Sequence, residues 1–178
     1  MEGDHVDEIL RQWGRERPDV DVSAMAIIGR ISRLERLIGV RLDQVFEAHG
    51  LEAWEFDVLA TLRRSGSPFE LSAGKLLDAM MITSGTMTNR IDRLEHRGFV
   101  RRGKDPADGR VVLVALTPAG RRRVDAALVA HAANELDIIS SLSQRDRDAL
   151  TRVLRRLHLS LDTDHRKVRG VGAGPASP

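Results

Sequence analysis

The sequence predicts a mainly α-helical protein with one small β-hairpin. Apolar residues recur at steps of three and four along most of the 178 residues, which is the helical period. Only residues 99–116 break this pattern, with two short apolar runs around a turn-forming segment. The chain is 42% hydrophobic and 30% charged, which is an ordinary composition for a globular protein. It has no cysteine, so it is not a disulfide scaffold.

The N-terminal part is predicted to form three helices. A short helix covers about residues 6–15 and ends before Pro18. A long helix follows over about residues 23–48, and Gly50 ends it as a C′ glycine would. A third helix covers about residues 53–64. The apolar positions of the long and third helices are Ile27, Ile31, Leu34, Ile38, Leu42 and Val45, then Phe56, Leu59, Ala60 and Leu62.

The central part is predicted to hold two short helices and the hairpin. The first helix starts after Leu71 with Ser72 as its N-cap. The second starts at Thr83 or Ser84 and runs to Arg97, before Gly98. Two strands, 99–102 and 111–116, flank a turn over residues 103–109. The inward residues of the two helices are Leu76, Leu77 and Met80, then Met87, Ile91 and Leu94.

Two further helices are predicted before the C-terminus. The pair Thr117-Pro118 opens the first, with a hydroxyl cap and proline at the first helical position. The second begins at Ser143 with Asp146 three residues later, a variant of the capping box. From Asp164 the chain is predicted to be disordered. The two helices are expected to bury Val124, Leu128, Ala132, Leu136 and Ile139, then Leu150, Val153, Leu154 and Leu157.

Positive charge is concentrated in the middle of the chain. The net charge is only +2, but residues 83–123 contain ten basic and four acidic side chains. Such a basic centre is typical of a surface that binds a polyanion. A solvated helix face with many arginines is the alternative interpretation. With 3% aromatic residues and no tyrosine, a stacking platform for single-stranded nucleic acid is not expected.

Two short helices followed by a hairpin with a basic tip predict a winged helix-turn-helix. Small polar residues at the start of the second helix can meet base edges in the major groove. An arginine at the hairpin tip can enter the adjacent minor groove, where the negative potential attracts it. The pattern therefore favours binding to double-stranded DNA.

The sequence resembles the MarR family of transcriptional regulators in this central part. The similar segments are residues 71–77, 84–100, 105–110 and 111–120. The resemblance implies a homodimer with a helical dimerisation region, and a repressor that binds a pseudo-palindromic operator. The expected organisation is an extra N-terminal helix (1–20), a dimerisation helix (21–50), a winged DNA-binding lobe (51–118), C-terminal dimerisation helices (119–162) and a disordered tail (163–178).

The resemblance also suggests which residues contact DNA. Candidates for base and phosphate contacts lie on the second central helix, and Arg110 is the candidate at the wing tip. In the family the acid two residues earlier, here Asp108, braces this arginine. A second wing arginine of the family is replaced by Gly109, so one contact is missing. The alternative for Ser84 is a helix cap only. The helix candidates are Ser84, Thr86, Thr88, Asn89 and Arg90.

The extra N-terminal helix with Trp13 resembles the urate-responsive subgroup of the family. In that subgroup a Trp, an Asp and an Arg seven apart, and a further Arg are linked to ligand response. The matching residues are Trp13, Asp57, Arg64 and Arg90, with Arg102 as a second match for the last. A related subgroup responds to tricarboxylates such as citrate and aconitate, so the resemblance implies urate or such a tricarboxylate as the effector. Arginine can bind anions of this kind through paired hydrogen bonds.

Simpler roles are open for each of these residues. Trp13 can anchor the extra helix to the body of the protein. Asp57 and Arg64 can form a surface pair that contributes little to stability. Arg90 can contact phosphate.

Other function classes are disfavoured. The six histidines form no i, i+4 pair, so no metal site is expected, and neither a phosphate loop nor a nucleophile elbow is present. We therefore expect no enzyme and no cofactor. No apolar run reaches about 18 residues and the N-terminus is no secretory signal, which favours a cytoplasmic, nucleoid-associated protein. The alternatives are an effector-independent DNA-binding protein and a helical dimer that binds a protein partner.

Overall fold

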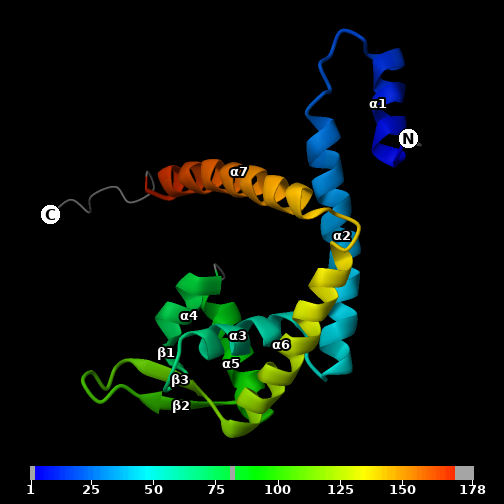
Figure 1. The fold of residues 1–178 in the computed structure, drawn as a ribbon. Helices are drawn as coiled ribbons and strands as arrows, with labels where there is room; N and C mark the ends of the chain where they lie inside the picture. Colours follow the sequence, from blue (N-terminus) through cyan, green and yellow to red (C-terminus); the bar gives the residue numbers. More distant parts are fainter. Residues whose placement is uncertain (1–2, 81–82, 171–178) are drawn as a thin grey trace, which may run out of the picture. The chain divides into compact units, whose positions relative to one another are not determined.

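The computed structural model describes residues 3–80 and 83–170 (Figure 1). Seven helices and three strands lie in these ranges, and the predicted helices are confirmed to within a few residues. The chain divides into two compact units between Asn134 and Glu135. The elements are α1 (His5–Glu16), α2 (Met25–Ala48), α3 (Ala53–Arg64), β1 (Glu70–Ser72), α4 (Ala73–Met80), α5 (Ser84–His96), β2 (Val100–Lys104), β3 (Val112–Leu116), α6 (Pro118–Ile138) and α7 (Gln144–Gly170).

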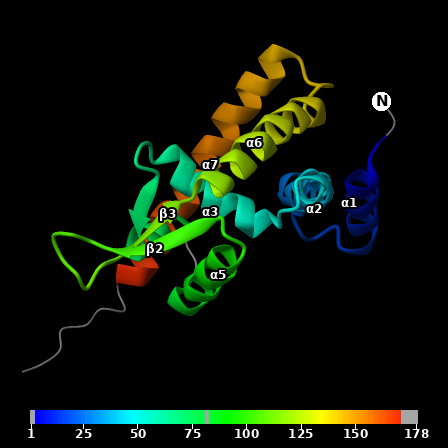
Figure 2. The ribbon, with the colours of Figure 1, turned by 90° about the horizontal axis from the view of Figure 1, so that it is seen from below.

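The sheet has three strands where the sequence predicts two. Its order is β1-β3-β2, with both pairs antiparallel. The unpredicted strand β1 pairs Glu70 with Ala115 and Ser72 with Leu113 of β3. Three residues are too few to show an alternating pattern, and the partner strand comes about 40 residues later, so local sequence could not reveal it. β2 and β3 form the predicted hairpin, which extends from the sheet beside α5 (Figure 2).

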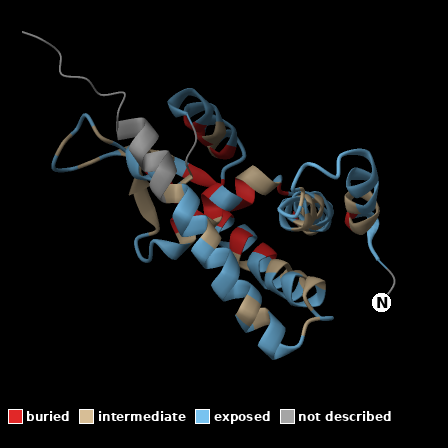
Figure 3. Cartoon of the chain, turned by 90° about the horizontal axis from the view of Figure 1, so that it is seen from above, coloured by how far each residue is buried: buried red, intermediate tan, exposed pale blue. Residues whose placement is uncertain are grey.

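The hydrophobic core lies in the winged lobe, by which we mean α3 through β3. Figure 3 shows the buried residues gathered there. Helices α3, α4 and α5 direct their apolar stripes inward as predicted, and the start of α6 closes the core. The buried residues include Phe56, Leu59, Leu62, Leu76, Met87, Ile91, Leu94, Val114 and Val124, while Ala60, Leu77 and Met80 are partly buried against them.

Much of the predicted burial outside this lobe does not occur within one chain. On α6 only the first half is covered, so Leu128 and Leu136 stay 44% and 61% exposed. Ala132 is exposed as well. Leu150, Val153 and Leu154 of α7 are likewise exposed. Within a single chain the predicted burial is therefore not found at these positions. These helices carry more apolar surface than one chain covers, as the expectation of a helical dimerisation region requires.

The N-terminal helix α1 docks on α2 through its first turn. Val6 is buried and packs against Gly29. Arg30 of α2 donates hydrogen bonds to Asp4 at 2.8 and 2.9 Å and to Asp7 at 2.7 Å. Trp13 remains 43% exposed, so the anchor of this helix is Val6 with the Arg30 cluster and not Trp13.

The ends of α2 and α7 can be compared with the capping residues and the tail that the sequence predicts. His49 ends α2, and its Nδ1 lies 2.9 Å from the Val45 carbonyl oxygen, followed by Gly50 with a positive φ of 62°. The Ser143 hydroxyl accepts a hydrogen bond from the Asp146 backbone N–H at 3.3 Å, as the capping pattern predicts. Helix α7 continues to Gly170, beyond the predicted start of the tail at Asp164. The rest of that tail, 171–178, lies outside the described residues.

Candidate nucleic-acid interface

Helix α5 separates its apolar and polar residues onto different faces. Met87, Ile91 and Leu94 are buried in the lobe. The N-cap is Thr83, whose hydroxyl accepts from the Thr86 backbone N–H at 3.4 Å. The simpler alternative, that Ser84 serves only as the helix cap, is therefore wrong. The residues left exposed at the N-terminal end of this helix are Ser84, Thr86, Thr88 and Asn89.

The arginines of α5 lie along a third face, against α3. Arg97 forms an ion pair with the buried Glu55 and donates to the Gly50 carbonyl oxygen at 2.6 Å. Arg93 forms an ion pair with Glu52. Both arginines are thus paired with carboxylates of the same chain, so the basic excess counted in the sequence overstates the charge available to a polyanion.

Arg90 does not lie with the exposed polar residues. It is only half-exposed, and its guanidinium carbon lies 5.4 Å from the centre of the Trp54 ring. That position is within cation–π range.

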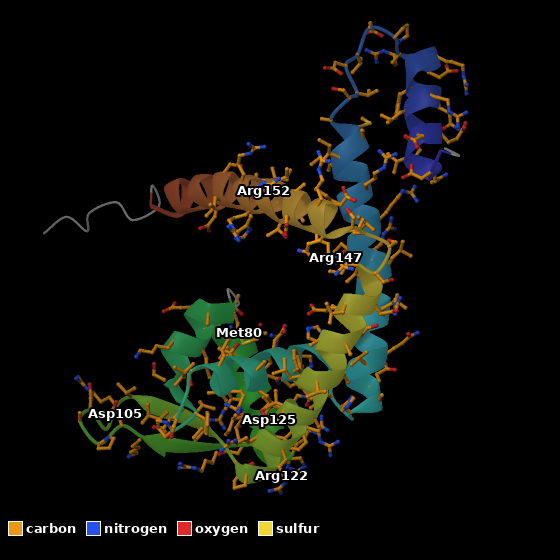
Figure 4. The ribbon with its side chains drawn as sticks, in the orientation of Figure 1. Met80, Asp105, Arg122, Asp125, Arg147 and Arg152 are labelled. Carbon is orange, nitrogen blue, oxygen red and sulfur yellow. The ribbon has the colours of Figure 1, made fainter. Side chains whose placement is uncertain are left out.

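The hairpin tip presents Arg110 to solvent. Its side chain is 91% exposed, and it donates to Asp108 from Nε at 3.0 Å and from Nη2 at 3.1 Å. Hydrogen bonds from the Arg110 side chain, and then from its backbone, lower the pKa of Asp108. The loop that holds this pair begins at Asp105, which is labelled in Figure 4. The Asp105 carboxylate accepts a hydrogen bond from the Ala107 backbone N–H at 2.7 Å. The carboxylate therefore restricts where the exposed guanidinium can point.

The base of the hairpin is tied to α5 by Arg102. Its backbone N–H and its Nη1 both donate to Glu95, at 2.9 and 2.6 Å, and its Nη2 lies 2.5 Å from Asp92. The second candidate for an effector arginine thus already has two acidic partners. The hairpin is thus tied to α5 through Arg102, whereas Arg110 at its tip is exposed to solvent.

Three of the four residues predicted to hold an effector lie near one another. Asp57 and Arg64 are two turns apart on α3, and Arg90 faces α3 from α5. Protein atoms crowd the Asp57 carboxyl and raise its pKa, although the residue is exposed as a whole. Electrostatic interactions with Arg90 and Arg64, and to a smaller extent with His131, partly offset this rise. The Asp57 carboxyl group thus lies within the electrostatic influence of two arginines, one on its own helix and one on α5.

Trp13 is not brought to this group within one chain. It lies on α1, which packs beside the N-terminal half of α2, whereas α3 follows the other end of α2 (Figure 1). Cavities of about 770, 380 and 300 Å³ are lined by other residues than these four. The smallest of the three lies beside α5 and includes Ser84, Thr88 and Arg102.

Two other features of the described residues bear on function. No group of three or more His, Asp or Glu side chains that could hold a metal ion occurs among the side chains described, those of residues 3–80 and 83–162. Within residues 3–80 and 83–170, no helix has both the length and the apolarity needed to cross a membrane.

Sequence reasoning missed the contribution of α3 to this interface. The arginines on one side of α5 contact three residues at the start of α3, namely Glu52, Trp54 and Glu55. None of the three was predicted to be a functional residue. A signal was available, because Arg90, Arg93 and Arg97 recur at steps of three and four and so share one helix face. What the pattern could not show is which residues that face meets.

Comparisons with known proteins agree with this geometry. Residues 51–112 match the model of the MarR family. The transcriptional regulator PecS of Dickeya dadantii is 42% identical over 156 residues, covering 88% of this chain and 94% of that protein. AbsC, a MarR family regulator from Streptomyces coelicolor, has a similar fold, with a TM-score of 0.74 and 20% identity over 81% of this chain and 97% of that one.

A third similar protein has a known effector. BpsR of Bordetella bronchiseptica is 27% identical, with a TM-score of 0.67 over 76% of this chain and 94% of that one. Its DNA binding is regulated by 6-hydroxynicotinic acid. The named relatives are regulators and not enzymes.

Proposed function

The chain belongs to the MarR family of transcriptional regulators, and on that premise we propose that it is a dimeric repressor released from its operator by a small organic anion. The observation that carries the proposal is the exposed polar N-terminal end of α5 beside a wing that presents Arg110. Ser84, Thr86, Thr88 and Asn89 would contact bases and phosphates of the major groove. Such a protein would be found with the nucleoid.

A dimer places two such helices on one face of the duplex. In DNA-binding dimers of this kind the recognition helices lie about one helical turn, roughly 34 Å, apart. The operator would then be pseudo-palindromic. The regions proposed for pairing are residues 21–50 and 119–162, which carry most of the large apolar side chains that one chain leaves exposed.

Replacing Arg110 with alanine is expected to weaken binding to most DNA sequences. A wing arginine in the minor groove contributes charge more than base recognition, so the slope of log affinity against log salt should fall by about one. The measurement is the fluorescence anisotropy of a labelled duplex from upstream of the gene, at two salt concentrations. Arg11→Ala, an exposed arginine of α1, is the control. An unchanged affinity for Arg110→Ala would exclude the wing contact.

The effector site is proposed to involve Asp57, Arg64 and Arg90, with Trp13 as a flat apolar wall. An anion attracted by the two arginines would compete with Asp57 for Arg90, and Arg90 is part of α5. The regulation of BpsR by an aromatic acid supports an effector of this class. Urate and a tricarboxylate such as citrate or aconitate are the candidates. Because Trp13 lies at the far end of α2, we infer that the site needs the dimer.

Trp13→Phe combined with Arg64→Ala is expected to keep DNA binding and to lose release by the ligand. Neither residue belongs to the exposed polar end of α5, so operator affinity should stay within about threefold. Anisotropy titrations with urate, and separately with citrate, test this. If the double variant leaves the operator at the same ligand concentration as the wild type, the effector binds elsewhere. If neither anion affects the wild type, the regulator is effector-independent or responds to another compound.

A further inference from the structure

We propose that the first turn of α3 is a seat that sets the orientation of α5 toward DNA. The α3 seat consists of Glu52, Trp54 and Glu55. Its partners Arg93 and Arg97 then act as positioning residues and not as phosphate contacts. This inference rests on the proposed DNA-binding function and adds residues to it.

The aromatic ring of the seat lies under two arginines. The guanidinium carbons of Arg93 and Arg90 are 4.7 and 5.4 Å from the centre of the Trp54 ring. Both distances are within the range in which a guanidinium is attracted to an indole face. The indole Nε1–H donates to the Glu52 carboxylate at 2.7 Å, so the ring is held by its edge as well as covered on its face.

Both carboxylate oxygens of Glu52 have partners, one within the seat and one on α5. One oxygen of Glu52 accepts from Trp54 and the other from Arg93. The hydrogen bond from Trp54, with a smaller contribution from Arg93, lowers the pKa of Glu52, so this carboxylate is ionised at neutral pH.

Glu55 is fully buried and holds the other end of the helix. Its Oε2 accepts from Arg97 and from the Glu52 backbone N–H at 2.9 Å. Removing the cation from a buried carboxylate is strongly unfavourable, which fixes Arg97 in place.

The seat supplies what apolar packing alone cannot. Met87, Ile91 and Leu94 set how deeply α5 sits in the lobe, but apolar contacts are not directional. Ion pairs and hydrogen bonds are directional, so contacts at positions 90, 93 and 97 fix the rotation of the helix about its axis. Base recognition tolerates errors of only about 0.5 Å and 10–20°. The rotation of α5 therefore decides whether Ser84 and Asn89 reach the bases.

A charge exchange between Glu52 and Arg93 tests this inference. The variants are Glu52→Arg, Arg93→Glu and the two together, and the double variant keeps the wild-type net charge. The quantity measured is specificity, the ratio of the affinity for the operator to the affinity for an unrelated duplex. We expect each single variant to lose at least about tenfold in this ratio, and the double variant to regain most of the loss. The control is the same exchange on α1, between Glu8 and Arg11, a surface pair at 2.6 Å. It should change nothing.

A phosphate contact would give a different pattern. If Arg93 binds phosphate, Arg93→Glu weakens binding to the operator and to the unrelated duplex equally. It also lowers the slope of log affinity against log salt. Adding Glu52→Arg would then give no rescue, and the inference would be wrong. Single variants that bind as the wild type does would also overturn the seat, while the proposed function would stand. Wild-type protein that binds no duplex in a salt-sensitive way would overturn both.

The two tryptophans allow a second test that does not need DNA. In a Trp13→Phe background Trp54 is the sole tryptophan. Its emission is expected to change in Arg93→Glu and to return in the charge exchange, while the melting temperature stays nearly constant, because an exposed ion pair contributes little to stability. In the wild-type background, Trp54→Phe should retain operator specificity and Trp54→Leu should lose it, because only an aromatic ring attracts the arginines. Emission that does not respond to Arg93→Glu, or equal specificity for Phe and Leu, would refute the seat.

Discussion

Replacing Gly120 with alanine is expected to lower the free energy of unfolding by about 3 kcal/mol. A methyl group at this buried position of α6 would lie 2.0 Å from the Phe99 carbonyl oxygen and 2.8 Å from its carbon. These are backbone atoms, and the same oxygen accepts from the Thr117 backbone N–H at 3.0 Å. No side-chain rotation can relieve the overlap. The start of α6 would have to leave the lobe, taking Val124 and Ala127 out of the core.

Thermal and urea unfolding, followed by circular dichroism, measure this effect. The loss corresponds to a fall in melting temperature of roughly 6–12 °C for a chain of this size. Gly14→Ala is the matched control, because a methyl there meets nothing within 4 Å in the exposed part of α1. It should be neutral or stabilising by up to about 1 kcal/mol. All proteins are compared at one concentration, since dimerisation shifts apparent stability. Equal melting curves for the two variants would contradict the close packing of α6 on Phe99.

The helices were predictable because their signals are local. The third helix was predicted over residues 53–64 and α3 has those bounds, since a periodic apolar pattern and a loop with glycine and proline mark them. The strand β1 was not predictable, because it exists through pairing with a distant strand. Burial on α6 was predicted for Leu128 and Leu136, which are exposed. Periodicity identifies an apolar face but not whether the same chain covers it.

The candidate site was predictable only in part, for the same reason. The small polar residues at the start of α5 and Arg110 near the hairpin tip follow from local sequence. The partners of Arg93 and Arg97 do not, because they are distant in the sequence: Glu52 and Arg93, for example, are 41 residues apart. Counting charges treated Arg93, Arg97 and Arg102 as available to DNA, whereas each is paired with a carboxylate. Contacts between distant segments decide which charges a polyanion can reach.

Introducing glutamate at both Ile27 and Leu37 is expected to convert the proposed dimer into a monomer. These side chains are 61% and 67% exposed within one chain, so they contribute little to its own core. Burying an Ile or Leu contributes about 1.5–3 kcal/mol, and a charge at a buried position is costly. Operator affinity should fall by roughly 10²–10⁴-fold, because the second half-site would no longer be bound by a linked lobe. The other exposed large apolar residues of α2 are Met25, Ile28, Ile31, Leu34 and Val40.

Light scattering and the anisotropy titration separate the possible results of this experiment. The monomer has a mass of 19.8 kDa. Ser32→Glu is the control, because it adds one of the two negative charges to α2 at an exposed residue five positions from each mutated site, on another face of the helix. It should remain dimeric with full affinity, and circular dichroism should show both variants folded. If the double variant remains a dimer with full affinity, α2 does not form the interface. Since Leu136, Val153 and Leu154 are also exposed, α6 and α7 would then have to supply the apolar contact alone.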